Sequence, residues 1–559
     1  MNLFLVRKWV PFLLLAAATA AVWGHTLGFE FVWDDRYFIT ELESVRSLAN
    51  IPAMFHELEA QGTKPLVFQV FRPIRTAHYA LLHFLGGKAL PQAWIFHLAN
   101  VLWHGATALL LYFTSLRLFA CLRAGWTEER GRVHALIVAL GFAVHPTASE
   151  VVCWAKGLDD VLATFFALAA LRELLKSSDE RQANWRALGL FVLAVYSKES
   201  AVAFALVPLV ICRSIHRLSW NRSLRRTAAF VLIAALYVVH RRLVLGRNSQ
   251  VAPLSGTYVQ TLVDMLQVVP IYLRLSFGIP PFRIDYSYLP SGLSLASACG
   301  LTLLAGLGTA TVLAWRRTSF RPAAFGLLWT GLFLLPVSNL LPMMQYMAER
   351  FLYLPLAGWL IALATLLAVI PRQTPVRALA FAGLLAWALV ARQRSQVWRD
   401  DYTLYVTHYT RGPKTERLEH NVRAALLQLP GIQRVTVVDE AGLLHVGPAP
   451  DAAALAAALA DYEHALVVLP DDAPLLSGYA TTLGNAGRFE EAVRIYERVV
   501  VLRPKPPVHW VNLARALTLT GQPEKARAAA AQAAARAPND ANVLALQAQI
   551  EAQLRKKAE

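Results

Sequence analysis

The sequence has few cysteines and few charged residues. Its four cysteines, Cys121, Cys153, Cys212 and Cys299, are far apart in 559 residues and form neither a CxxC pair nor a zinc-binding spacing. This excludes a disulfide scaffold or a zinc module, and we interpret the cysteines as inert packing residues. Charged residues make up only 16% of the chain, whereas hydrophobic residues make up 56%. That balance excludes an ordinary soluble protein and predicts a multi-span α-helical membrane protein.

Several motifs of well-understood chemistry are also missing. The sequence has no glycine-rich phosphate loop, no Ser–His–Asp triad in motif form, no HExxH pair and no nucleic-acid-binding module. We therefore predict that the protein requires neither a metal nor a cofactor. The net charge of +17 does not indicate a nucleic-acid partner, because much of the excess Lys and Arg lies in short loops between apolar segments, where membrane topology explains it.

Apolar segments of roughly 20 residues, the length that crosses a bilayer, recur through the first 400 residues. We predict eleven spans, at 9–27, 96–119, 133–149, 160–175, 185–197, 199–213, 227–245, 293–315, 323–341, 351–370 and 377–392. Basic loops follow the even-numbered spans, which places those loops in the cytoplasm by the positive-inside rule. We interpret segment 258–278 as re-entrant or interfacial rather than as a further crossing.

The first apolar segment has two interpretations. Arg7 and Lys8 precede an apolar stretch that ends near Gly28, as in a cleaved signal peptide. The acidic pair and the spans that follow favour an uncleaved first span instead, with its N-terminus in the cytoplasm.

The soluble part of the chain contains a repeat. After Arg394 the composition becomes charged and alanine-rich, and Pro470, Pro504 and Pro538 are spaced 34 residues apart. A helix–turn–helix period of 34 residues is typical of tetratricopeptide repeats, which stack into an α-solenoid. We predict such repeats, with a C-terminal capping helix, over 469–559.

These patterns divide the chain into three parts. Residues 1–400 form the predicted membrane module, and 29–95 is its first extracytoplasmic loop. Residues 413–468 are predicted to be a small α/β or helical connector, because the apolar pattern at 430–447 resembles two strands joined by a turn.

The strongest chemical signal is the adjacent pair Asp34 and Asp35, directly after the first span. Carboxylates at the edge of a bilayer are costly and usually mark chemistry, although an interfacial turn or a helix N-cap is the alternative. Clusters of charged residues recur at 145–159, at 197–199 and at 349–350, all on the same predicted side. We therefore predict one polar site, assembled from several helix ends beyond the bilayer.

Five ordered stretches resemble a known family. These are FVWDDRYF, FRPIRTAHYALLHFLGG with FHLANVLWHG, HPTASEVVCWAKGLDDVLATFFALAAL, YSKESAVAFALVP and AERFLYLPLAG. They are similar to the successive motifs of the transmembrane and tetratricopeptide repeat-containing O-mannosyltransferases and their bacterial relatives, in the GT-C glycosyltransferase superfamily. The resemblance covers about residues 1–400. It implies a GT-C transmembrane module, inversion at the anomeric carbon, and a catalytic base at Asp34 or Asp35.

One element departs from the family pattern. The usual Gly-Arg-Ala-Asp/Glu element is Gly157–Leu158–Asp159–Asp160 here, so only Asp160 matches the family's acid and the arginine is missing. We do not carry over the identity of the sugar.

Further residues of the recurring clusters are candidates to bind the phosphate and sugar of a donor. They are Arg72, His97, His104, His145, Glu150, Lys156, Asp160, Lys198, Glu199, Glu349 and Arg350. The cations among them suit a departing phosphate, which fixed positive charges stabilise. Each has a structural alternative: histidines can bond neighbouring helices, and adjacent opposite charges, as at 198–199 and 349–350, can neutralise each other.

Together these observations predict a bacterial inner-membrane glycosyltransferase with its active site and its repeats in the periplasm. Because an outer compartment lacks nucleotide sugars, the donor would be a sugar on a polyprenyl-phosphate carrier held in the membrane lipid. The acceptor would be Ser or Thr of a periplasmic protein or peptide, which the repeats would hold. A GT-C transferase acting on a glycolipid or polysaccharide, and a non-catalytic membrane-anchored repeat scaffold, are the two alternatives. No nucleic-acid partner is expected.

Overall fold

The computed structural model describes residues 9–63, 70–122, 125–176, 184–246, 252–286, 292–438, 444–446 and 451–558. The chain forms two compact units, Met1–Leu404 and Tyr405–Glu559. Helices dominate both units, in agreement with the predicted helical class.

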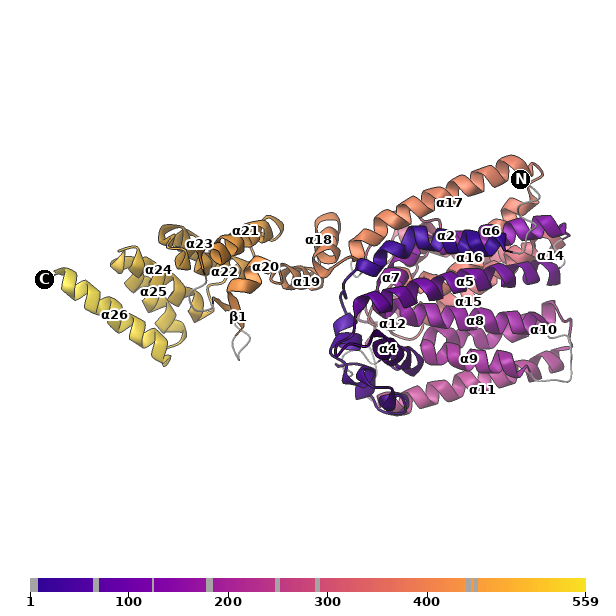
Figure 1. Ribbon diagram of the computed structural model, residues 1–559, viewed down its shortest axis with the longest axis horizontal. Coiled ribbons are helices and arrows are strands. Elements are labelled where there is room, and N and C mark those ends of the chain that lie inside the picture. Colours follow the sequence, from indigo (N-terminus) through magenta and orange to yellow (C-terminus); the bar gives the residue numbers. More distant parts are fainter. Residues whose placement is uncertain are drawn as a thin grey trace. The chain divides into compact units, whose positions relative to one another are not determined.

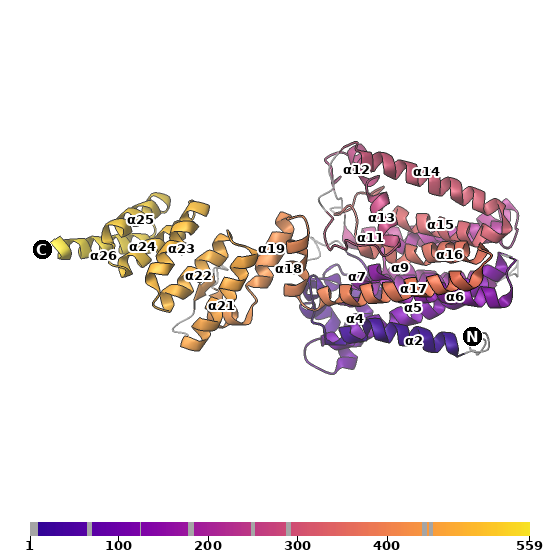
Figure 2. The same cartoon turned by 90° about the horizontal axis from the view of Figure 1, so that it is seen from above.

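The first unit is a bundle of α-helices. In chain order they are α2 (Val10–Trp23), α4 (Pro73–Gly86), α5 (Ala93–Cys121), α6 (Glu128–Ala143), α7 (Ser149–Cys153), α8 (Leu158–Lys176), α9 (Trp185–Ser197), α10 (Val207–Ser214), α11 (Trp220–Leu245), α12 (Tyr258–Met265), α13 (Val268–Ser276), α14 (Leu295–Arg316), α15 (Arg321–Leu334), α16 (Tyr353–Val369) and α17 (Gln373–Ser395). Short 3₁₀ turns that matter for the site are η1 (Gly24–Gly28), η7 (Pro146–Ala148), η8 (Ala155–Gly157), η9 (Glu199–Leu206), η12 (Glu349–Leu352) and η13 (Gln396–Trp398). The long helices lie side by side (Figures 1 and 2).

Seven helices among the described residues are long and apolar enough to cross a membrane, or eight if a bent pair counts as one span. The eleven predicted spans are therefore not confirmed. Segments 160–175, 185–197 and 199–213 fall outside the set. The reason differs for each segment. Helix α8 has charged residues at both ends, and α9 has only 13 residues. The third segment is a 3₁₀ helix, η9, followed by the short helix α10.

Segment 258–278 is not one continuous helix. It forms α12 and α13, of 8 and 9 residues, and each is much shorter than the roughly 20 residues that a crossing needs. The two helices pack with Tyr286 and Met347 in a small apolar core.

The bent pair is α6 with η7 and α7, which meet at 44°. Pro146 explains the break, because proline cannot continue the hydrogen-bonding pattern of the preceding helix. The His145 side chain caps the next turn by accepting the N–H of Thr147 at 3.3 Å. This bend brings α7 and η8 to the same end of the bundle as the loop that follows α2.

The short elements gather at one end of the bundle. Figures 1 and 2 both show α4, α7 and α12 at this end, whereas α2 begins at the opposite end. Contacts between separate segments bring several of the predicted site residues together.

The second unit contains the repeats. Its helices are α19 (Glu416–Leu426), α20 (Pro430–Val435), α21 (Ala452–Val468), α22 (Ala473–Asn485), α23 (Phe489–Leu502), α24 (Pro507–Leu519), α25 (Pro523–Arg536) and α26 (Ala541–Ala558), while α18 (Asp401–Arg411) connects the two units. Helices α22, α24 and α26 begin 34 residues apart. Gly487 and Gly521 have φ angles of +77° and +69° in the turns that close α22 and α24, a left-handed conformation that favours glycine.

A short hairpin lies between α20 and α21. Strand β1 (Thr436–Val438) pairs antiparallel with β2 (Leu444–Val446), with Val437 opposite His445. Strands of three residues do not establish a separate α/β domain, so the predicted insert over 413–468 is not confirmed and stays a prediction.

Candidate active site

Asp35 is fully buried, and the backbone holds its carboxylate. Oδ2 accepts the N–H of Val32 at 3.0 Å, and Oδ1 accepts the N–H of Lys156 at 2.9 Å. Burial raises the pKa of Asp35 to about 8, although these two hydrogen bonds oppose the shift. Asp35 thus ties the loop after α2 to η8, and this contact fixes the backbone beside Asp34.

Asp34 has different surroundings. It is half-buried, and its carbonyl accepts the N–H groups of Tyr37 and Phe38 at 3.0 and 3.3 Å, which begins a short π-helical turn. The side chains of Lys156 and Arg350 lie within electrostatic range of Asp34. Of the two acids, Asp34 is therefore the one that combines exposure with nearby cations.

Lys156 is a buried lysine between aromatic rings. Its Nζ lies 4.5 Å from the ring centroid of Trp154 and 5.1 Å from that of Phe38. Burial lowers its pKa to about 7, and Asp159 and Asp34 partly oppose this. Within the described part of the chain, Lys156 forms no ion pair, so its ammonium is not neutralised by a bonded carboxylate there.

Arg350 lies in η12, and its side chain approaches the Trp154 ring, as that of Lys156 does. Glu150 accepts the backbone N–H of Arg350 at 2.9 Å and also binds its guanidinium group, which links α7 to η12. The guanidinium carbon lies 5.8 Å from the ring centroid of Trp33 and 5.6 Å from that of Trp154. These two rings stack, with centroids 4.8 Å apart and planes at 16°. We call Trp33, Asp34, Glu150, Lys156 and Arg350 the Asp34 cluster.

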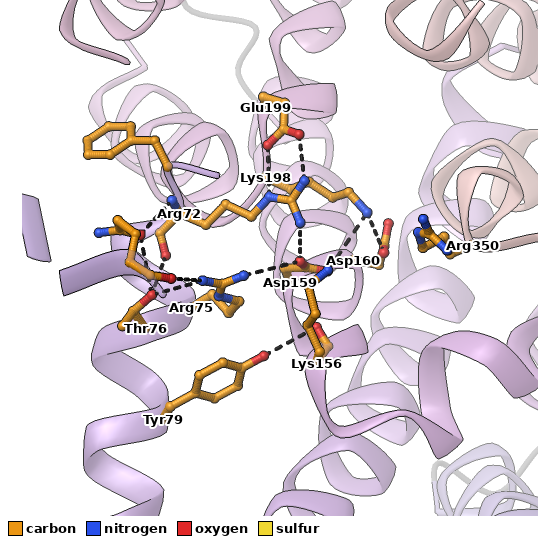
Figure 3. A network of polar contacts seen from close by, with 12 residues as sticks. Arg72, Arg75, Thr76, Tyr79, Lys156, Asp159, Asp160, Lys198, Glu199 and Arg350 are labelled. Carbon is orange, nitrogen blue, oxygen red and sulfur yellow. Dashed lines mark hydrogen bonds and ion pairs between the residues drawn. The ribbon is translucent and has the colours of Figure 1, made fainter. Parts of the chain in front are cut away.

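A second group of charges adjoins this cluster. The Arg72 network consists of Arg72, Arg75, Asp159, Asp160, Lys198 and Glu199 (Figure 3). Arg72 donates to both oxygens of Glu199, at 2.8 and 2.5 Å, and also binds Asp159. Although burial opposes it, the carboxylates of Glu199 and Asp159 raise the pKa of Arg72 well above its usual value. The arginine thereby joins the start of α4 to α8 and η9.

Lys198 completes the network. Its Nζ binds Asp160 and lies 3.8 Å from Oδ1 of Asp159, while Arg75 approaches Oδ2 of Asp159 to 3.9 Å. Figure 3 shows the three cations converging on Asp159 and Asp160, with Arg350 beside Asp160. Three cations face three carboxylates, so this network is close to neutral.

The three candidate histidines are fully buried and have partners inside the protein. His97 Nε2 contacts the carbonyl of Glu30 at 3.3 Å. His104 contacts Tyr353 Oη at 2.6 Å and the Ala143 carbonyl at 3.1 Å, and His145 contacts Thr147 and the Ser276 carbonyl. Contacts of His97, His104 and His145 join separate segments of the bundle, and a donor-binding role for these histidines stays a prediction.

Glu349 also has an internal environment. It is fully buried and accepts the N–H of Arg283 at 2.5 Å and the hydroxyl of Tyr286 at 2.9 Å, with Arg394 at 3.6 Å. Glu349 therefore anchors a loop against α17, although it is adjacent to Arg350 in sequence.

Sequence reasoning did not select Asp159, Arg75, Trp154 or Asp401 as site residues. Asp159 is the centre of the Arg72 network, and Oδ1 of Asp401 accepts the N–H of Trp33 at 2.7 Å. A usable signal existed for Asp401, because Trp398–Arg399–Asp400–Asp401 is a second acidic pair close to a tryptophan after a span. Arg75 lies in the first turn of α4 and Arg72 directly precedes this helix, and both approach Oδ2 of Asp159.

The described residues contain no group of three or more His, Cys, Asp and Glu side chains arranged to hold a metal ion. What the cluster offers is a half-buried carboxylate, two cations and an aromatic surface. That set can remove a proton and stabilise an anion, as a transfer from a phosphate-linked donor requires.

The chain is similar in sequence to several known proteins. Protein O-mannosyl-transferase TMTC4 of Mus musculus is 23% identical over 455 residues, which cover 70% of this chain and 61% of that protein. TMTC3 of Mus musculus is 22% identical over 92% of this chain and 62% of its own length, and TMTC1 of Mus musculus is 31% identical over 30% of this chain and 17% of its own. The chain is a distant relative of these O-mannosyl-transferases. It spans about three fifths of the length of TMTC4 and TMTC3.

The tetratricopeptide repeat family matches residues 486–550, which confirms the predicted repeats. One solved structure, the APC/C hetero-tetramer Cut9–Hcn1, aligns with 85% of this chain and 93% of its own at 13% identity, with a TM-score of 0.21. A likeness this low carries no argument about the fold.

The departure at Leu158 has a structural counterpart. Leu158 is fully buried in an apolar core with Phe38, Tyr79 and Leu162. Instead of an arginine at that position, Arg72 and Lys198 supply the positive charge around Asp159 and Asp160.

Proposed function

We propose that the protein is a glycosyltransferase that moves a sugar from a polyprenyl-phosphate carrier to Ser or Thr of a periplasmic protein, with inversion, and that Asp34 is its general base. The observation that supports the proposal is that the two adjacent acids have different surroundings. Asp35 is buried and bound to backbone N–H groups, whereas Asp34 is half-buried beside Lys156 and Arg350.

The chemistry follows from these positions. The Asp34 carboxylate takes the proton of the acceptor hydroxyl as its oxygen bonds to the anomeric carbon, and the bond from that carbon to the phosphate oxygen breaks. A positioned base of this kind contributes roughly 10²–10⁴-fold to the rate. The departing carrier phosphate gains negative charge, which Lys156 and Arg350 would stabilise.

The remaining predicted residues have supporting roles in this proposal. Arg72, Asp160, Lys198 and Glu199 hold α4, α8 and η9 together around the cluster, and Glu150 orients Arg350. The proposal places the site and the repeats in the periplasm of a bacterial inner membrane, with the first span's N-terminus in the cytoplasm. The repeats would present the acceptor, because stacked helix pairs form a concave surface of peptide width.

Intact-mass analysis of periplasmic proteins tests the proposal. Cells with the wild-type gene should contain a protein heavier by one sugar, and this mass should be absent both without the gene and with Asp34→Asn. A change only in lipid or polysaccharide would instead indicate the glycolipid transferase. Normal assembly of a repeat-bound complex with no glycan change in any cell fraction would indicate the scaffold.

A further inference from the structure

Asp401 lies at the start of α18, at the far end of the first unit's sequence, yet it contacts the loop of Asp34. Its Oδ1 accepts the backbone N–H of Trp33 at 2.7 Å, across 368 residues of sequence. Close by, the carbonyl of Arg399 accepts the N–H of Glu30 at 2.9 Å. Two hydrogen bonds therefore join the segment after α17 to the loop after α2.

Trp33 needs such support because its backbone is unusual. Its φ angle is +57°, in the left-handed region that large side chains avoid. A residue keeps such a conformation only when its surroundings enforce it. The hydrogen bond to Asp401 holds the Trp33 peptide, and the Trp33 ring packs against Trp154 and Trp398, with centroids 4.8 and 6.2 Å apart.

The conformation of Trp33 sets the direction in which the chain enters Asp34. On the other side of Asp34, its carbonyl is already fixed by the N–H groups of Tyr37 and Phe38. Asp401 supplies the contact to the Trp33 peptide itself, in addition to the hydrogen bonds between Val32 and Asp35 that close the turn. Without the Asp401 contact, the Trp33–Asp34 segment loses one of the restraints on its backbone conformation.

We propose that Asp401 is a positioning residue for Asp34: by accepting the Trp33 N–H, it holds the left-handed turn that aims the Asp34 carboxylate at the reacting hydroxyl. This inference rests on the proposed role of Asp34 as the base. It requires an acceptor oxygen at position 401 and does not require a negative charge there.

Three variants of the full-length protein in nanodiscs separate these requirements. Asp401→Ala removes the acceptor, and Asp401→Asn removes the charge but keeps a side-chain carbonyl. Asp400→Ala is the matched control, since Asp400 accepts the N–H of Thr403 at 2.7 Å and pairs with Arg399 without contacting Trp33. All three alter the same four-residue segment.

Sugar transfer to an acceptor protein from a polyprenyl-phosphate-linked hexose gives the kinetic test. Displacement of a catalytic base lowers the rate on the order of 10–100-fold. The kcat of Asp401→Ala should therefore fall by about this factor, while KM for the donor stays within about twofold of the wild-type value. Asp401→Asn and Asp400→Ala should keep kcat close to wild type. Equal kcat in Asp401→Ala and wild type, or equal losses in Asp401→Ala and Asp401→Asn, overturns the proposal.

Hydrogen–deuterium exchange of the peptide containing Trp33 gives a readout that needs no sugar transfer. Exchange should be faster by about tenfold or more in Asp401→Ala and unchanged in Asp401→Asn and Asp400→Ala. If the wild-type protein transfers no sugar, the proposed function fails, and unchanged exchange in Asp401→Ala separately refutes the contact. Faster exchange in Asp400→Ala would also overturn it, because loosening of α18 would then explain the effect.

Discussion

At Asp34 and Asp35, one peptide bond separates two different environments. The buried Asp35 carboxylate accepts two backbone N–H groups, while the half-buried Asp34 lies near Lys156 and Arg350. Asp35 therefore fixes the loop, and the proposed function assigns the contact with substrate to Asp34.

If Lys156 binds the donor phosphate as proposed, donor binding should depend on pH. Because its pKa is lowered to about 7, the ammonium is charged below that pH and neutral above it, while a carrier phosphodiester stays charged throughout. KM for the donor should therefore rise as pH increases through 7. The rise should reach about 10–100-fold, the value of a charge-assisted hydrogen bond. Steady-state kinetics from pH 6 to 9 measures it.

Lys156→Arg is the control for this prediction. A guanidinium remains charged over the whole range, so KM of the variant should stay flat with pH. The same rise in KM in both proteins would show that another group is responsible.

The sequence predicts several site residues but does not predict their partners. Asp34, Lys156 and Arg350 are predicted because acids and bases at span ends are costly and because they lie in motifs that resemble those of the family. Asp159 and Asp401 were not selected, since each acquires its role only through contacts to residues 87 and 368 positions away. Distances of that kind depend on the packed fold.

At the scale of the elements, the Arg72 network joins three segments that are far apart in sequence. Arg72 precedes α4, Asp159 lies in the first turn of α8, and Glu199 begins η9. The segments meet through buried or partly buried charges, so the geometry of this end of the bundle depends on the network being complete.

Removal of Arg72 should destabilise this end strongly. Arg72→Ala leaves Asp159 without its closest partner in a buried position, and breaking one side of a buried ion pair costs about 3–5 kcal/mol. A lower midpoint of thermal unfolding, measured in detergent by intrinsic tryptophan fluorescence, is the expected result. Arg132→Ala on α6 is the control, because the exposed pair of Arg132 with Glu128 contributes roughly 0.3–0.5 kcal/mol. Equal effects of the two substitutions would contradict a structural role for the network.

Element type was easier to predict than the number of spans. Eight predicted spans correspond to helices of membrane-crossing length when the bent pair counts as one. The segments at 160–175, 185–197 and 199–213 do not, because apolar composition alone cannot distinguish a bundle helix that is short or charged at its ends from a crossing one. The break at Pro146 was visible in the sequence, whereas the angle between the helices it separates was not.

At the scale of the whole molecule, the chain combines a helical membrane unit with a repeat unit. The 34-residue period could be predicted from the sequence because each repeat has the same small residues at its turns. Gly487 and Gly521 have positive φ angles in these turns, a conformation that favours glycine.

Removal of the repeats should separate acceptor binding from donor chemistry. A chain that ends after Arg411 retains the first unit and α18 but lacks the helices that match the repeat family. If the repeats hold the acceptor, KM for an acceptor protein should rise on the order of 10²-fold through lost effective concentration, while KM for the donor is unchanged. Transfer to a short Ser-containing peptide serves as the control and should change little. An unchanged KM for the acceptor protein would contradict this role.

In the proposed function, Asp34 removes the proton of the acceptor hydroxyl and Asp35 holds the loop. Single-turnover transfer at saturating donor, compared between wild type, Asp34→Asn and Asp35→Asn, measures this directly, with thermal unfolding recorded for each protein. Asp34→Asn should lose about 10²–10⁴-fold in rate with an unchanged unfolding midpoint, whereas Asp35→Asn should lower the midpoint. If Asp34→Asn transferred the sugar at the wild-type rate, this result would contradict the role of Asp34 as the base.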